Sequence, residues 1–435
     1  MSLENALLLA AYLNRTLLLP PLYSCRRQLN IVWGPTSGLL YRWSLRSREH
    51  SEICRNESPS LTRPKTFMSI VNMNKEQLEQ DCWVYHAWTT TPWTYIFDLP
   101  KVIQGVVGIA GQTEPIRVFD RPNVSVAWMQ EHLQIQDLDK EVYWINATTR
   151  WDLQVLDDSD PDYIAPPVIV EDPYHVEPVY ETKMLLSDLK ARTEKVIHFG
   201  SIYGTGRVTA LSEKHLQLQH YINGHLDIRN HHVLDATDLA LKQLEEWRIM
   251  TGRAPDVPSF LGAHLRTGDG GFVRKVAENV QVLTEWVREM VKQGPTILPT
   301  STTAELPPPP TRRAATEQQN IPSFLDRCMG QPPESPLIFV ATDIPAPRES
   351  PDLTAFLEEF PCTAFLSDLP ASIAILDVRN PVDNVKMMSY LIALMDANVA
   401  AHGREFHGTP QSTVTYYIKD HLWPQYHPER HVLVN

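Results

Sequence analysis

The stretch "FLGAHLRTGDGGF", Phe260–Phe272, passes from an apolar run to a histidine, an arginine and a Gly-Asp-Gly-Gly turn. A short apolar run that ends at a glycine-rich turn is typical of a buried strand. Arg266 would then follow the carboxyl end of that strand. Ligands of parallel α/β sheets bind outside the carboxyl ends of the strands, so Arg266 is a candidate for holding an anion.

The residues after this stretch continue as alternating helices and strands. Such alternation is the signature of a parallel, doubly wound sheet. The expected elements are a helix at Val273–Gln293 ended by Gly294-Pro295, a strand in "PLIFVATD", a helix in "LTAFLEEF", a strand in "TAFLSDL", an apolar helix at Val385–Met395, a strand in "EFHG" and a last helix after "TPQSTVTYYI". The proline-rich segment at about 295–320 interrupts this rhythm and is expected to be a disordered insertion.

The first half of the chain opens with an amphipathic helix, expected at about Ser2–Asn14, and a short strand at Thr16–Leu19. A helix followed by a strand is the second half of a β-α-β unit, so the first strand is expected to be missing. Further helices are expected near Thr182–Glu194 and Asp235–Thr251. We therefore predict an N-terminal domain at residues 1–240 and a C-terminal domain at residues 241–435.

Composition excludes several classes of protein. With 435 residues, 43% hydrophobic and 21% charged, the chain is globular and long enough for two domains. A net charge of -13 argues against an extended nucleic-acid surface, which needs clustered Lys and Arg. No apolar run reaches the ~18 residues of a membrane span.

Cysteines and glycosylation sequons give a mild indication of the compartment. The five cysteines are too few for a disulfide-dense scaffold and form no C-x-x-C pair. Four N-x-S/T sequons favour the secretory pathway, where disulfides are permitted; they begin at Asn14, Asn56, Asn123 and Asn146. Disulfides among Cys25, Cys54 and Cys82 would then be permitted.

Polar groups follow three of the expected C-terminal strands. They are Arg266, Asp343, and Thr409 with Ser412 and Thr413. An arginine fork can grip two phosphate oxygens, and a helix start favours phosphate. Asp343 could accept hydrogen bonds from a base or a ribose. The three strand ends together therefore favour an anionic, nucleotide-like ligand.

Structural interpretations compete with each of these functional ones. His264 fits a hydrogen-bonded core histidine, Ser412 fits a helix N-cap, and Asp343 fits a turn cap. Asp158-Ser159-Asp160 forms a D-x-D that could hold a metal bound to a sugar nucleotide, but its acidic, proline-rich surroundings indicate a solvated loop. The glycines of "GSIYGTGRV" lack the spacing of a dinucleotide site.

Three motifs in the second half resemble the GDP-fucose protein O-fucosyltransferases and their fungal relatives. They are "HLRTGD" (His264–Asp269), the "VATD" strand end (Val340–Asp343) and "MDANVAAHGREFHGTPQSTVTYYI" (Met395–Ile418). "SLENALLLAAYLNRTLLLPP" resembles the segment after the N-terminal motif of that family. The resemblance implies a GT-B fold of two Rossmann-like domains facing across a cleft, with GDP-fucose held mainly by the C-terminal domain.

The resemblance also implies an activity, which is the inverting transfer of fucose from GDP-fucose to a Ser or Thr of a protein. The implied location is the lumen of the endoplasmic reticulum or Golgi, and the implied reaction needs no metal or other cofactor. Arg266 would be the catalytic residue, binding the β-phosphate and stabilising the departing GDP. The implied substrate-binding residues are His264 beside it, Asp343 near the nucleoside, Ser412 and Thr413 on the diphosphate, and Asp396 at the acidic position before the final strand.

Two departures from the family leave alternatives open. Val414 and Thr415 replace the usual "F-S" after "ST". The Gly/Asn-rich loop, which supplies the catalytic base in some members, would lie upstream of Met1, together with a signal anchor. If catalysis does not need that segment, we expect a GDP-fucose-dependent hexosyltransferase. If catalysis does need it, we expect a non-catalytic GT-B remnant that binds a nucleotide or glycan. A metal-dependent GT-A transferase using Asp158 and Asp160 ranks third, and the sequence does not identify the acceptor protein.

Overall fold

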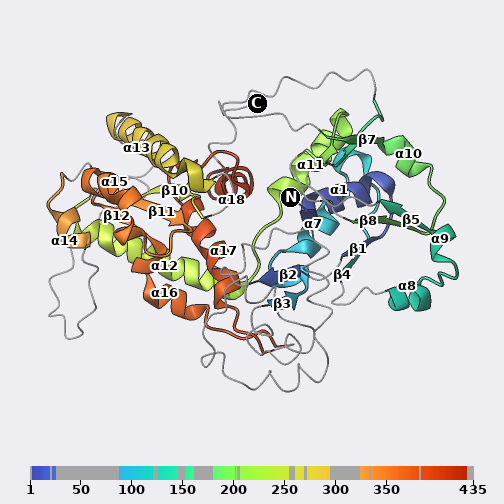
Figure 1. Cartoon of the computed structure of the whole chain (residues 1–435), viewed down its shortest axis with the longest axis horizontal. Helices are drawn as coiled ribbons and strands as arrows, with labels where there is room; N and C mark the ends of the chain where they lie inside the picture. Colours follow the sequence, from blue (N-terminus) through green and yellow to red (C-terminus); the bar gives the residue numbers. More distant parts are fainter. Residues whose placement is uncertain are drawn as a thin grey trace. The chain divides into compact units, whose positions relative to one another are not determined.

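The structure is a computed structural model, and it shows a mixed α/β protein with several parallel sheets (Figure 1). It describes residues 2–19, 22–25, 88–120, 126–145, 152–160, 180–200, 202, 206–253, 260–268, 272–293, 324–332, 335–381 and 384–428. The predictions for Asp269, for residues 295–320, for three sequons (Asn56, Asn123, Asn146) and for the side chains of Cys25, Cys54 and Cys82 lie outside these residues.

The chain divides into two compact units. The first comprises Met1–His231 and Asp377–Leu391, and the second comprises His232–Leu376 and Ile392–Asn435. The long helix α12 (His231–Met250) begins at the junction and contains residue 240, where the sequence-based division was placed. Each unit has its own sheets and its own hydrophobic core.

The second unit is built on a four-stranded parallel sheet. Its strands are β10 (Leu261–Leu265), β11 (Ile338–Thr342), β12 (Thr363–Ala364) and β13 (Phe406–Gly408), in the order β12-β11-β10-β13. The chain moves outward from β10 to β12 and then returns to the other side of β10. The strand order therefore reverses between β10 and β13, which is where ligands bind in open α/β sheets.

Helices connect these strands. Val280, Leu283 and Val287 of α13 share the core with Leu261 and Val340 of the sheet, which confirms the predicted apolar spacing of this helix. The helices are α13 (Val276–Gln293), α14 (Phe324–Met329), α15 (Thr354–Glu359), α16 (Pro370–Ile375), α17 (Met388–Ala401), α18 (Thr413–Tyr417) and α19 (Trp423–Tyr426), with 3-10 turns at Phe272–Lys275, Pro347–Glu349, Pro351–Leu353 and Leu366–Asp368 and a π turn at Ile418–Leu422.

The first unit contains several smaller sheets. Its largest places β6 (Leu153–Leu156) between β7 (Thr182–Leu185) and β9 (Val208–Thr209), all parallel. The other strands are β1 (Leu17–Leu19) with β4 (Val118–Asp120), β5 (Val142–Ile145) with β8 (Val196–Phe199), and the antiparallel pair β2 (Leu22–Cys25) and β3 (Trp88–Thr91). The helices are α1 (Ser2–Leu13), α7 (Leu99–Gly105), α8 (Val126–His132), α9 (Leu138–Glu141), α10 (Leu186–Lys190) and α11 (Glu213–Gly224), with 3-10 turns at Trp93–Tyr95 and Ile109–Gly111.

Three predicted elements differ from the structure. The apolar helix predicted at Val385–Met395 runs over Met388–Ala401, because Lys386 forms an antiparallel bridge with Arg379 before the helix begins. The helix predicted at Thr182–Glu194 is wrong over its first residues, which form β7 because they pair with β6, and only Leu186–Lys190 is helical. The strand predicted in "TAFLSDL" is reduced to Thr363–Ala364, because Leu366–Asp368 turns into a 3-10 helix.

A buried carboxylate in the first unit joins the end of β6 to the start of α11. Asp157, which follows β6, is 4% exposed and accepts hydrogen bonds from the backbone N–H groups of Leu211 and Ser212, each at 3.0 Å. His215 Nδ1 lies 2.7 Å from Asp157 Oδ2. The negative charge therefore sits at the amino end of α11, where the helix dipole stabilises it.

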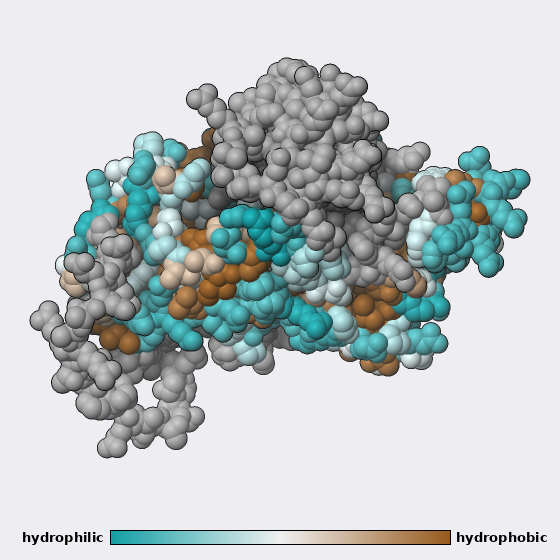
Figure 2. Space-filling model, turned by 90° about the horizontal axis from the view of Figure 1, so that it is seen from below, coloured by the Kyte–Doolittle hydropathy of each residue, from teal (hydrophilic) through white to brown (hydrophobic). Residues whose placement is uncertain are grey.

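Apolar side chains at the surface are dispersed. On the face shown in Figure 2, brown apolar areas are separated by teal hydrophilic ones. The exposed large apolar residues of the described ranges come from many different elements: Val107, Phe119, Trp144, Leu185, Ile249, Met250, Val273, Val291 and Met329. None of the helices described has the length and apolar character needed to cross a bilayer.

The last helical segment docks onto α17 and the turn after it. His402 and Tyr426 stack with ring centroids 3.6 Å apart, and Tyr426 donates to Asn398 Oδ1 at 2.6 Å. Trp423 Nε1 donates to the carbonyl of Gly403 at 3.0 Å. Burial lowers the pKa of His402 from 6.5 to about 4, because the charged ring would be poorly solvated there.

We expect His402 to make the protein acid-sensitive. Because its pKa is lower in the folded than in the unfolded state, the unfolded chain binds a proton first as the pH falls below 6.5. The free energy of unfolding then decreases down to about pH 4, by at most about 1.4 kcal/mol per pH unit. Thermal melts should show a shallower pH slope for His402→Gln than for the wild type, whereas the slope of His220→Gln, an exposed control, should match the wild type. Equal slopes for all three proteins would contradict the prediction.

Candidate functional site

Arg266 lies at the reversal point of the four-stranded sheet. Its backbone N–H donates to Thr409 Oγ1 at 2.9 Å, and Thr409 N–H donates to the carbonyl of His264 at 2.9 Å. These contacts join the ends of β10 and β13 and fix the direction in which the arginine leaves the strand. The side chain of Arg266 is 22% exposed, so its guanidinium is partly accessible to a ligand.

Asp343, which follows β11, holds the turn that contains Arg266. Its Oδ1 accepts from the backbone N–H and the hydroxyl of Thr267 at 2.8 and 2.9 Å. Its Oδ2 accepts from Gly268 N–H at 2.9 Å and lies 3.2 Å from Arg266 Nη1. A carboxylate offers about four acceptor positions, and here all of them face the turn. Asp343 therefore positions Arg266, and its place near the nucleoside, which the resemblance implies, stays a prediction.

Gly268 is required by this arrangement. A Cβ atom at residue 268 would lie 2.5 Å from Asp343 Oδ2, closer than nonbonded atoms approach. The absence of a side chain lets the Gly268 N–H reach the carboxylate. The contact with Asp343 thus explains why the residue at this position of "HLRTGD" is a glycine.

His264 lies in β10, in which every residue is buried. It is 7% exposed, and its Nδ1 lies 2.8 Å from Thr415 Oγ1. Burial lowers the pKa of His264 to about 4, an effect that Asp343 opposes and Arg266 reinforces. The imidazole is therefore neutral at pH 7, as expected of the hydrogen-bonded core histidine that the strand pattern indicated.

Thr415 was noted in the sequence only as a departure from the family motif. In the structure its hydroxyl pairs with His264, and its methyl carbon occupies the space where a Cβ of residue 408 would come within 2.4 Å. Gly408 and Thr415 therefore pack directly together at the end of β13.

Ser412 and Thr413 form the start of α18. Ser412 is 2% exposed and holds the N-cap position in extended conformation, but its side chain makes no capping hydrogen bond. Thr413 is half-buried. Both follow the turn after β13, so they lie at the carboxyl edge of the sheet to which Arg266 also belongs.

Asp396 belongs to α17 and supports β11. Its Oδ2 accepts from the backbone N–H of Thr342 at 3.1 Å. Thr342 in turn donates its hydroxyl to the carbonyl of Leu265 at 2.9 Å. Asp396 thereby stabilises the strand end from which Asp343 extends.

Asp158, by contrast, caps a helix of the first unit. It accepts from the backbone N–H of Ser187 at 2.9 Å and also from the hydroxyl of Ser187. Ser187 belongs to the first turn of α10, so Asp158 has a structural role from within the loop that its surroundings indicated. Within the described ranges, no group of three or more His, Cys, Asp or Glu side chains could hold a metal ion.

The structure joins Arg266, Asp343 and Thr409 by direct contacts and pairs His264 with Thr415. Sequence reasoning missed the roles of Thr267 and Thr415, although both lie inside the motifs that it singled out. A comparison of the chain with protein-family models finds no match, and a comparison with curated proteins finds none either. The case for a function therefore rests on these contacts and on the motif resemblance.

Gly268→Ala should disrupt this site. The added methyl group collides with Asp343 Oδ2, so the turn must shift or the carboxylate must leave. We expect a loss of about 1–3 kcal/mol in the free energy of unfolding, measured by urea denaturation. Gly330→Ala is the matched control in the same unit, because its Cβ would meet only an ordinary contact at 3.6 Å. Equal stability of the two variants would show that Asp343 does not constrain the turn.

Proposed function

We propose that the second unit binds the diphosphate of a nucleotide sugar at Arg266, and that the protein is an inverting glycosyltransferase. The donor that the motif resemblance supports is GDP-fucose, and the acceptor is a Ser or Thr hydroxyl of a protein. The observation that carries the proposal is the partly exposed guanidinium of Arg266 at the point where the strand order reverses. Asp343 pairs with this guanidinium, and Thr409 holds the backbone N–H of Arg266.

Held in this way, an arginine suits the chemistry of sugar transfer. The acceptor oxygen attacks the anomeric carbon from the face opposite the diphosphate, and the bond from that carbon to the diphosphate oxygen breaks. Negative charge grows on the leaving diphosphate in the transition state. A guanidinium already fixed by Asp343 stabilises that charge without reorganising.

The wider assignments of the proposal follow the same resemblance. Two units with parallel sheets are compatible with a GT-B enzyme in which the second unit holds the nucleotide. Ser412 and Thr413 would donate to the diphosphate from the turn after β13. The proposed location is the lumen of the secretory pathway, which the disulfide between Cys328 and Cys362 supports.

A nucleotide-binding protein without transferase activity is the second candidate. The contacts of Asp343 and Thr409 position Arg266, which could bind an anion, and none of these contacts places a base beside an acceptor hydroxyl. His264 is buried and paired with Thr415, so it does not fill that role. Fucose transfer by the full chain to a folded acceptor domain would exclude this candidate.

Arg266→Ala should weaken GDP binding strongly. We expect a loss of at least about tenfold in affinity by isothermal titration calorimetry, and a loss of about 100-fold or more in transfer rate from GDP-fucose. Arg266→Lys should retain only part of the GDP affinity and part of the transfer rate, because an ammonium group lacks the planar fork of a guanidinium. Arg288→Ala, which removes an exposed partner of Glu359, is the control and should bind GDP as the wild type does. The proposal fails if the wild type does not bind GDP or if Arg266→Ala binds equally well.

A double-mutant cycle tests the positioning role of Asp343. If Asp343 acts through Arg266, Asp343→Asn should weaken GDP binding in the wild-type background and have little further effect in the Arg266→Ala background. The same loss in both backgrounds would instead mean that Asp343 acts independently of the Arg266 side chain, through the nucleotide or through the backbone of the turn. Calorimetry on the four proteins distinguishes these outcomes.

A further inference from the structure

Asn14 is an exposed residue at the end of a buried helix. Residues Leu3–Tyr12 of α1 are buried, whereas Asn14 and Thr16 are exposed. Asn14-Arg15-Thr16 is one of the four sequons in the sequence and the one that lies in the described ranges.

The backbone at Asn14 forms a helix stop. Asn14 has a φ of 50°, in the left-handed region. Its N–H donates to the carbonyl of Ala11 at 3.3 Å, and Arg15 N–H donates to the carbonyl of Ala10 at 3.0 Å. This pair of bonds is the Schellman motif, in which glycine is the commonest residue at the left-handed position and asparagine also occurs. The cap explains an asparagine here, but it does not explain a threonine two residues later.

The side-chain geometry suits a modified amide. Arg117 Nη2 donates to the backbone carbonyl of Asn14 at 2.9 Å and to its Oδ1 at 3.4 Å. A glycan on Nδ2 leaves Oδ1 in place as an acceptor. The next side chain, Arg15, donates to the carbonyl of Glu194 at 2.8 Å, so the turn is anchored while Asn14 and Thr16 face solvent.

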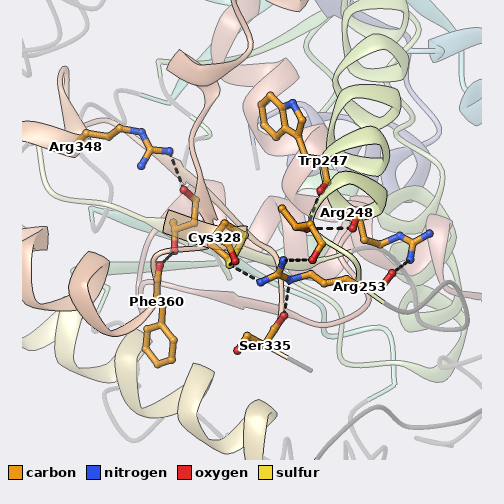
Figure 3. The surroundings of a disulfide bond; sticks show 10 residues. Trp247, Arg248, Arg253, Cys328, Ser335, Arg348 and Phe360 are labelled. Atoms are coloured by element: carbon orange, nitrogen blue, oxygen red, sulfur yellow. Dashed lines mark hydrogen bonds between the residues drawn. A yellow bond between two sulfur atoms is a disulfide. The ribbon is translucent and has the colours of Figure 1, made fainter. Parts of the chain in front are cut away.

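A disulfide in the second unit indicates the compartment. Cys328 and Cys362 are bonded, and they are 0% and 2% exposed. Figure 3 shows the surrounding contacts: Arg253 donates to Cys362 Sγ at 2.5 Å and to the carbonyl of Ser335 at 2.7 Å. Disulfides form and persist in oxidising compartments such as the lumen of the endoplasmic reticulum, where asparagine glycosylation of sequons also takes place.

From these observations, we propose that Asn14 carries an N-linked glycan in the folded protein. The co-reactant is an oligosaccharide carried on a polyprenyl diphosphate. The amide nitrogen Nδ2 attacks the first sugar carbon, the bond from that carbon to the diphosphate oxygen breaks, Nδ2 loses a proton, and the polyprenyl diphosphate leaves. This proposal does not depend on the proposed transferase function, because it needs only the compartment, the sequon and the exposed turn.

The test is to express the full chain in a eukaryotic secretory pathway and map the glycan on Asn14. Peptides are made with a protease other than trypsin, because trypsin cuts after Arg15 within the sequon. Enzymatic removal of the glycan in heavy-oxygen water converts a glycosylated asparagine to a mass-labelled aspartate. We expect the label at Asn14 in the wild type and in Thr16→Ser, which keeps the sequon, and no label in Thr16→Ala.

Asn14→Gly separates the cap from the glycan. Glycine suits the left-handed position, so this variant should fold with an unchanged or slightly higher melting temperature and carry no glycan at residue 14. An unmodified Asn14 in secreted wild-type protein whose Cys328–Cys362 disulfide has formed would overturn the proposal. A glycan found only on chains that are retained and misfolded would overturn it as well.

Discussion

Three hydrogen bonds from one turn and the ion pair with Arg266 converge on the carboxylate of Asp343, and the candidate site depends on that convergence. The parallel register of β10 and β11 sets Leu265 beside Thr342, so the next residue of each strand, Arg266 and Asp343, meets at the sheet edge. Without the carboxylate, the N–H groups of Thr267 and Gly268 would lose their acceptor. The same carboxylate pairs with the guanidinium of Arg266 and orients it. Asp343 therefore determines both the fold of the turn and the position of the Arg266 side chain.

Much of the second unit could be predicted from the sequence, because its elements have clear periods. The apolar spacing of Val276–Gln293 and the apolar runs before Arg266 and Asp343 predicted a helix and two strands that the structure contains. That polar residues at these strand ends share one sheet edge follows from the parallel topology. Which atoms they contact could not be predicted, because a strand pattern gives the position of Asp343 and not its partners.

Other features of the structure cannot be predicted from the local sequence pattern. The disulfide joins cysteines 34 residues apart, and the sequence directed attention to three other cysteines instead. Thr182–Leu185 has a composition compatible with a helix and becomes a strand only because β6 lies beside it. In the sequence, Thr415 stands out only as a departure from the family motif, whereas in the structure its hydroxyl pairs with His264. In each case tertiary contacts decided what local sequence left open.

The burial of α1 has a consequence for synthesis of the protein. This helix packs against α10 and α11, and Tyr12 donates to the carbonyl of His215, which lies 203 residues later. A helix apolar on most of its faces cannot reach its final place before those partners have left the ribosome. At about 5–20 residues per second, that delay is about 10–40 s. During this interval α1 stays unfolded, so chaperones can reach its residues Leu3–Tyr12, which the finished fold buries.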